Sequence, residues 1–318
     1  MIKTIVTTPL PVDEEFTIKK NVITNGSSSK RVCIVTGTHG DELEGQFICF
    51  LLQRTILDNL HLLDGTVEVY PALNPLGIDS ITRGIPNFDL DMNRIFPGSP
   101  DGSMAEQTAN AIVEDLKGAD MVIDLHSSNI FLREVPQARI NVNNADALVP
   151  YARKLNLEFI WIHEAATVLE STLAHSLNST GTPCIVVELG VGMRINHFYG
   201  KNTVLGLLNL LHTMGMWREK PTGLVNPEPI ISRGDEVAFI NASHSGIFST
   251  ETHNSRIVHE GMEIGQIIDP LSGTVVESVK ASATGFLFTI RAYPVCYEGS
   301  LLARIQTRNY IQPTQNCN

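Results

Sequence analysis

Residues 31–73 read RVCIVTGTHGDELEGQFICFLLQRTILDNLHLLDGTVEVYPAL and alternate between two kinds of hydrophobic spacing. The apolar run at 31–37 predicts a buried strand, residues 44–63 have the spacing of an amphipathic helix, and residues 66–73 predict a second strand. A helix between two such strands is typical of an α/β domain.

The same alternation continues to about residue 217. A polar stretch at 74–103 comes first, and its prolines and glycines predict loop. Beyond it we predict helices at 105–118, 145–157, 171–181 and 205–217, and strands at 121–128, 158–163 and 182–190. This order predicts a largely parallel or mixed sheet that is flanked by helices.

The sequence changes character after a proline-rich linker at 220–237. Only short strand-like runs separated by glycine follow, which predicts a small all-β unit. Residues 242–267 and 281–305 are similar to each other, because both begin with AS-x-x-G and both contain a Glu-Gly pair. We therefore expect two domains, an α/β domain at 1–220 and a barrel-like β domain at 221–318.

The two β-halves resemble the biotinyl/lipoyl-type barrel. Domains of that type that carry a swinging cofactor need a lysine at a hairpin tip. Neither half has a lysine between its first glycine and its Glu-Gly pair. The sequence therefore argues against a carrier role and favours a structural or site-covering one.

The composition is that of a folded globular protein. Hydrophobic residues make up 43% and charged residues 18% of the 318 residues, far from a disordered composition. The formal net charge is −11 and there is no long run of lysine and arginine, which argues against nucleic acid as the main partner. A single buried arginine still suffices to bind an anionic substrate.

The sequence predicts a cytoplasmic protein without a membrane partner. Residues 1–16 lack the apolar core of a signal peptide, and no segment reaches the roughly 18 to 20 apolar residues of a membrane span. The cysteines are odd in number and not closely paired, so we expect buried free thiols in a reducing compartment. They are Cys33, Cys49, Cys184, Cys296 and Cys317.

A histidine and two acids follow the first strand, at His39, Asp41 and Glu42. His39 and Glu42 are three residues apart at a strand-to-helix turn, where both can face one point, and zinc accepts imidazole nitrogen and carboxylate oxygen. The same pattern is more often a solvated helix start, where the helix dipole favours Glu. Taken alone, these residues leave a metal site and an ordinary turn open.

Two later strands also end in polar residues. His126 ends an apolar strand at the sheet edge where open α/β sheets bind their ligands, and Asp124 lies on the same face. Glu188 interrupts another apolar strand, where a carboxylate is costly unless it is paired or near a metal. A desolvated Glu suits a general base, while a structural histidine and a buried salt bridge are the alternative interpretations.

Asn93 and Arg94 lie in the irregular loop, with Arg83 ten residues before Asn93. The planar guanidinium of arginine binds a carboxylate with two parallel hydrogen bonds, which suits it better than lysine to this task. An arginine in such a loop is more often simply solvated. The interpretation as a substrate-binding group therefore depends on the other residues.

The order of GTHGDE, NR, DLH and VVELG within residues 30–215 resembles the succinylglutamate desuccinylase/aspartoacylase branch of the zinc carboxypeptidase-like (M14) family. The resemblance implies an α/β fold, a zinc-carboxypeptidase-like mixed sheet flanked by helices, followed by a small all-β C-terminal domain. It implies one Zn²⁺ per chain with His39, Glu42 and His126 as ligands. It implies Glu188 as the catalytic base.

The resemblance also implies that Asn93 and Arg94 bind a carboxylate of the substrate and that Arg83 polarises the scissile carbonyl. We therefore expect a zinc-dependent hydrolase that cleaves the amide bond of a small N-acyl amino acid, with Glu188 activating the attacking water. The alternatives are a metallocarboxypeptidase acting on short peptides and a non-catalytic module that binds a metal or ligand.

The segment STLAHSLNSTGTP at 171–183 departs from the aspartoacylase-like pattern. Members of that kind have a further arginine shortly before the strand of the catalytic Glu, whereas this segment has only His175. The acyl group, the amine and a homo-oligomeric state stay open.

Overall fold

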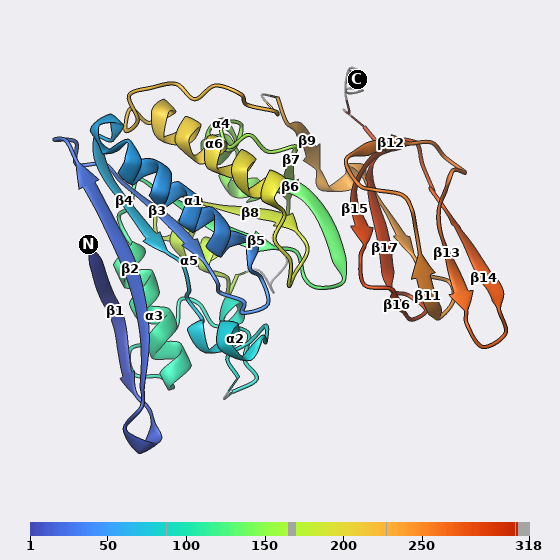
Figure 1. Ribbon diagram of the computed structural model, residues 1–318, viewed down its shortest axis with the longest axis horizontal. Helices are drawn as coiled ribbons and strands as arrows, with labels where there is room; N and C mark the ends of the chain where they lie inside the picture. Colours follow the sequence, from blue (N-terminus) through green and yellow to red (C-terminus); the bar gives the residue numbers. More distant parts are fainter. Residues whose placement is uncertain (87, 165–169, 227, 309, 311–318) are drawn as a thin grey trace.

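The computed structural model describes residues 1–86, 88–164, 170–226, 228–308 and 310 (Figure 1). Its helices are α1 (Glu44–Asp58), α2 (Pro75–Ser80), α3 (Met104–Leu116), α4 (Ala145–Ala152), α5 (Leu173–Ser179) and α6 (His197–Thr213). α3 begins with a capping box, in which the side chains of Ser103 and Glu106 each accept a hydrogen bond from the backbone N–H of the other. In the described part of the chain, no helix is long and apolar enough to cross a membrane.

The strands fall into two sheets. They are β1 (Ile2–Pro9), β2 (Glu15–Asn25), β3 (Arg31–Thr36), β4 (Gly65–Tyr70), β5 (Met121–Ser127), β6 (Leu132–Asn141), β7 (Phe159–His163), β8 (Cys184–Gly190), β9 (Ile230–Arg233), β10 (Val237–Asn241), β11 (Gly246–Ser249), β12 (Arg256–Val258), β13 (Glu263–Asp269), β14 (Thr274–Lys280), β15 (Gly285–Arg291), β16 (Val295–Cys296) and β17 (Leu301–Gln306).

The larger sheet has thirteen strands in the order β1-β2-β4-β3-β5-β8-β6-β15-β17-β10, with β7 beside β6, β9 beside β7, and β12 beside β15. Its central strands β4, β3, β5 and β8 are parallel, while β2 and β6 pair antiparallel with the two ends of this group. The predicted mixed α/β sheet is therefore confirmed.

Helices cover both faces of the parallel strands. α1, α4 and α6 contribute Leu52, Leu148 and Leu207 to the core on one face. α3 and α5 contribute Ile112 and Leu177 to the core on the other face. Because alternate residues of a strand face opposite cores, the sequence of each of these strands is an almost continuous apolar run.

The repeat in the sequence corresponds to two similar halves that exchange a strand. β12 of the first half pairs with β15 of the second, and β16 of the second pairs with β11 of the first. The repeated motifs also meet, because the N–H of Gly261 donates to the carbonyl of Ala281 and that of Gly299 to the carbonyl of Ala242. Both glycines have φ near +80°, which favours glycine. One half-sheet, β14-β13-β11-β16, is a separate antiparallel sheet, as the predicted fold class requires.

The C-terminal strands also extend the main sheet at one end of the molecule (Figure 1). β15 pairs antiparallel with β6, so that Thr289 lies opposite Glu134. The division of the chain into domains at residue 220 stays a prediction.

Some elements were not predicted from the sequence. β1, β2, β6 and α2 are absent from the predicted pattern, and the first helix ends at Asp58, before a short 3-10 turn at Leu60–Leu62. Within the described residues, the predicted free and buried thiols are Cys33, Cys49, Cys184 and Cys296. Cys317 lies outside the described residues.

Candidate metal centre and active site

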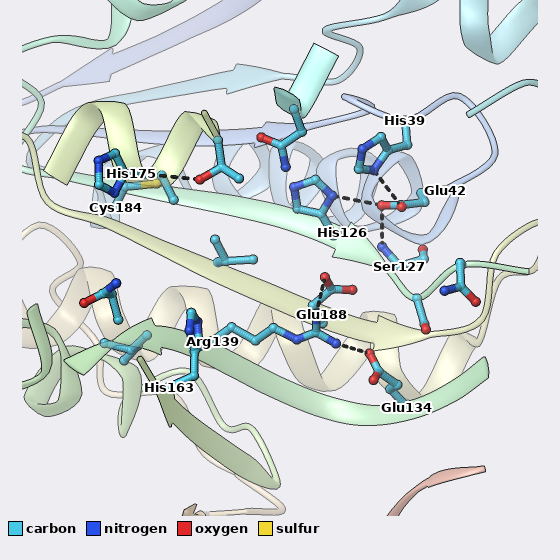
Figure 2. Close-up of a pocket in the computed structure, with 18 of the residues that line it drawn as sticks. His39, Glu42, His126, Ser127, Glu134, Arg139, His163, His175, Cys184 and Glu188 are labelled. Atoms are coloured by element: carbon cyan, nitrogen blue, oxygen red, sulfur yellow. Dashed lines mark hydrogen bonds and ion pairs between the residues drawn. The ribbon is translucent and has the colours of Figure 1, made fainter. Parts of the chain in front are cut away.

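A cavity of about 520 Å³ lies beside β5, β8 and β6, on the face of the sheet that α5 also covers (Figure 2). Every residue predicted as a metal ligand, catalytic base or substrate-binding group lines it. These residues are His39, Glu42, Arg83, Asn93, Arg94, His126 and Glu188.

The loop after β3 passes close to α2 at Gly40. A Cβ at Gly40 would lie 1.9 Å from the carbonyl carbon of Gly77, so a larger residue would displace the loop. The N–H of Gly40 donates to the carbonyl of Arg83 at 3.3 Å, and the N–H of Glu42 donates to that of His39 at 3.4 Å. The turn therefore directs His39 and Glu42 to one point, where each is only 3% exposed.

His126 and Glu188 come from neighbouring parallel strands. His126 on β5 lies directly opposite Glu188 on β8, so both side chains are on the cavity face of the sheet. Asp124 lies two residues before His126 and faces the same side. The two strand ends and the loop after β3 thus meet at one site.

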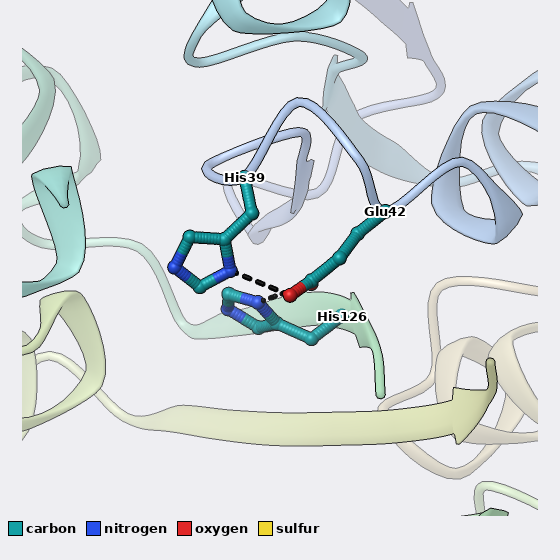
Figure 3. A group of neighbouring side chains, drawn as sticks. All are labelled: His39, Glu42 and His126. Carbon is teal, nitrogen blue, oxygen red and sulfur yellow. Dashed lines mark hydrogen bonds and ion pairs between the residues drawn. The ribbon is translucent and has the colours of Figure 1, made fainter. Parts of the chain in front are cut away.

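The side chains of His39, Glu42 and His126 form a buried cluster (Figure 3). Nδ1 of His39 lies 2.7 Å from Oε1 of Glu42, and Nδ1 of His126 lies 2.9 Å from Oε2. The candidate ligand atoms all lie within 4.8 Å of one another. Nε2 of His39 lies 3.0 Å from Oδ1 of Asp91, and Nε2 of His126 lies 3.1 Å from Oδ2 of Asp124.

The chemistry of this donor set fits a metal ion. Asp91 and Asp124 face the outer ring nitrogens, which leaves the two Nδ1 atoms and the Glu42 carboxylate pointing inward, as in carboxylate–histidine–metal sites. Burial opposes the charge of Glu42, but His39 and His126 hold its pKa well below the usual range. Burial lowers the pKa of His126, while Asp124 and Glu42 raise it well above its ordinary value. The site thus favours positive charge at its centre.

Glu188 has the environment of a proton acceptor. Its side chain is 15% exposed, and Oε1 lies 3.3 Å from Nη1 of Arg139. Burial raises the pKa of Glu188 to about 7, although the charge of Arg139 offsets part of this effect. A carboxyl group with this pKa can both take up and release a proton near neutral pH.

The structure brings Arg83, Asn93 and Arg94 to the cavity wall beside the cluster. Arg83 donates from Nη1 to Oε1 of Glu42 at 3.1 Å and from Nη2 to Oδ2 of Asp91 at 3.2 Å, and its side chain is 40% exposed. Arg94 donates from Nη1 to the backbone carbonyl of Asn93 at 2.8 Å. Arg83 is therefore already paired with two carboxylates of the site, while the Arg94 side chain is exposed.

Four charged residues of this site were not predicted from the sequence: Asp91, Glu134, Arg139 and Arg304. Asp91 has a weak sequence signal, because it is an acid two residues before Asn93 and caps the 3-10 turn there. β6, which carries Glu134 and Arg139, is interrupted by a proline and was not predicted as a strand.

A mixed α/β sheet that holds a buried His–Glu–His cluster beside a desolvated glutamate has the donor set and the base of a metal-dependent hydrolase. The sequence model of one protein family, the Succinylglutamate desuccinylase/Aspartoacylase catalytic domain, matches residues 28–214. The chain belongs to this family and is a deacylase.

Individual relatives agree with this assignment. The chain is 26% identical over 265 residues to N-alpha-acetyl-L-2,4-diaminobutyric acid deacetylase of Halomonas elongata, covering 81% of this chain and 76% of the relative. The product-bound ectoine utilization protein EutE (DoeB) of Ruegeria pomeroyi matches with a TM-score of 0.81 and 21% identity over 96% of this chain and 95% of that one. A succinylglutamate desuccinylase/aspartoacylase of Rhodobacter sphaeroides matches with a TM-score of 0.80 and 22% identity over 98% and 96%. The two structural matches show the shared fold.

Proposed function

We propose that the protein is a zinc-dependent hydrolase that removes the acyl group from a small N-acyl amino acid. The observation that carries this proposal is the position of Glu188, a desolvated carboxylate directly opposite His126 in the neighbouring strand. A general base beside a set of metal-ligand side chains in a cavity is an arrangement that suits amide hydrolysis.

His39, Glu42 and His126 would hold the zinc ion. Two imidazoles and one carboxylate are a common ligand set of catalytic zinc sites, which keep a further position open. A zinc ion held here supplies Lewis-acid chemistry, which polarises an amide carbonyl and makes water more acidic.

Residues of the chain account for proton transfer, substrate binding and charge stabilisation. Glu188 takes a proton from the attacking water and returns it to the leaving amine, so that one group serves as base and then as acid. Asn93 and Arg94 bind a carboxylate of the substrate and orient it toward Glu188. Arg83 stabilises the negative charge that develops on the scissile carbonyl oxygen.

The cavity favours a small substrate over a peptide. A volume of about 520 Å³ is within the range of small-molecule sites. Leu132, Glu134 and Arg139 of β6 and Arg304 of β17 close one side of it. A metallocarboxypeptidase acting on short peptides remains the second candidate, supported by the paired donors Asn93 and Arg94, which also suit a peptide C-terminus.

A hydrolysis screen tests the proposal. We expect the purified protein to cleave an N-acetyl or N-succinyl amino acid faster than any short peptide, and a chelator to abolish the activity until zinc is restored. N-alpha-acetyl-L-2,4-diaminobutyric acid is the first compound to test, because the curated relative is named for it. Faster cleavage of peptides would favour the carboxypeptidase. Activity that survives complete metal removal would overturn the metal-dependent mechanism.

The pH dependence of kcat/KM tests Glu188 as the base. Glu188 accepts a proton only as a carboxylate, and burial raises its pKa to about 7. The base is therefore present above this pH and is lost below it, so kcat/KM should rise with pH through an apparent pKa near 7. An acid limb near the ordinary value for glutamate would contradict this environment for Glu188.

A further inference from the structure

Four side chains of alternating charge form a row across the sheet, and Glu188 is the first of them. Glu188 on β8 lies 3.3 Å from Nη1 of Arg139 on β6, and Nη2 of Arg139 donates to Oε2 of Glu134 at 2.7 Å (Figure 2). Nη1 of Arg304 on β17 donates to Oε1 of the same Glu134 at 2.6 Å. All four line the cavity, and the last comes from the C-terminal strands.

An irregularity in β6 makes this row possible. Glu134 and Arg139 are five residues apart and would face opposite sides of a regular strand. The pairing of β6 with β8 shifts between Glu134 and Gln137, which brings both charged side chains to the cavity face. β15 continues the row, because Thr289 lies opposite Glu134 on one side and opposite Arg304 on the other.

The surroundings hold both arginines in place. Arg139 lies opposite Trp161 of β7 in the strand pairing, and its guanidinium lies 5.8 Å from the centre of the indole ring. The guanidinium of Arg304 lies 5.4 Å from the same ring and 5.8 Å from that of Phe239. Cation–π contacts of this kind, together with a Glu134 side chain that is only 1% exposed, fix the row.

The row is not arranged to bind an anionic substrate. Both terminal nitrogens of Arg139 already face carboxylates, those of Glu188 and Glu134, so its charge is balanced. The ion pair with Glu188 engages Oε1, so we expect Oε2 to be the oxygen that takes the proton. The task that fits this geometry is to fix the orientation of the Glu188 carboxylate.

We propose that Arg139 is a positioning residue for Glu188, held by Glu134 and Arg304, so that the C-terminal strands complete the active site. The inference rests on the proposed function, because it takes Glu188 as the general base. It gives the C-terminal β strands a defined part in the reaction, through Arg304, rather than only a covering role.

Arg139→Gln, Arg139→Lys and Arg304→Gln test the inference in the full-length protein. The assay uses the N-acyl amino acid that the wild type hydrolyses fastest, with the metal content measured in each preparation. We expect Arg139→Gln to lower kcat by about 100-fold with KM nearly unchanged, the effect of a misplaced catalytic group. Arg139→Lys should recover part of this loss, and Arg304→Gln should lower kcat less. Arg133→Gln, on the same strand but outside the row, is the matched control.

Two results would overturn the inference at full metal content. An unchanged kcat would remove Arg139 from the reaction, and a raised KM with unchanged kcat would make it a substrate-binding group. If Arg139→Gln does not fold, the same comparison of kcat with KM in Arg139→Lys and Arg304→Gln decides between these outcomes.

A double mutant separates this inference from the proposed function. If Arg139 acts through Glu188, Arg139→Gln should cause no further loss in a Glu188→Gln background. An additive loss would contradict the inference alone. Near-wild-type activity of Glu188→Gln by itself would instead contradict the proposed function.

Discussion

Glu188→Gln is expected to lower kcat by roughly 10²- to 10⁴-fold, the contribution of a general base, while the metal content stays that of the wild type. Glutamine has nearly the shape of glutamate but takes no proton at this position. Glu188 is not one of the three clustered candidate ligands, so its loss should leave metal binding intact. Steady-state kinetics and elemental analysis of one preparation measure both effects.

Glu158→Gln is the matched control for this prediction. Burial also raises the pKa of Glu158, but its carboxylate accepts a hydrogen bond from the hydroxyl of Ser255, away from the cavity. We expect its kcat to equal that of the wild type. If Glu188→Gln also retains near-full kcat, Glu188 is not the base and the proposed mechanism is wrong.

The sequence contained enough information to locate the residues at the ends of regular strands. His126 and Glu188 each lie near the end of an apolar strand, and the parallel order of the strands places such residues at one edge of the sheet. His39 and Glu42 follow the first strand of the same group, so one pattern accounts for the whole cluster. The periodicity of apolar residues is the signal that made these positions predictable.

The residues that hold this cluster in place depend on contacts that periodicity does not record. Arg139 was missed because Pro136 and an irregular pairing disturb the two-residue alternation of β6. Arg304 reaches the cavity only because β15 and β17 extend the main sheet, a pairing between distant parts of the chain. The repeat of AS-x-x-G and Glu-Gly predicted two β-halves correctly, but it gave no indication of the strand beside which they would pack.

His126→Ala is expected to release the metal from the purified protein and to abolish hydrolysis with it. The substitution removes one of three converging donors and leaves Oε2 of Glu42 with the N–H of Ser127, at 3.2 Å, as its remaining partner. Loss of a group that only supports a metal ligand costs about 10- to 100-fold in affinity, so loss of a ligand itself should cost more. Metal analysis after dialysis against a weak chelator measures the change.

His175→Ala distinguishes loss of a ligand from loss of any histidine in the cavity. His175 also lines the cavity but is not part of the buried cluster, so its variant should keep the metal stoichiometry of the wild type. In His126→Ala, added zinc at high concentration should restore little activity, because one of the three converging donors is missing. Unchanged metal content in His126→Ala would show that His126 is not a ligand and that the ion is held elsewhere.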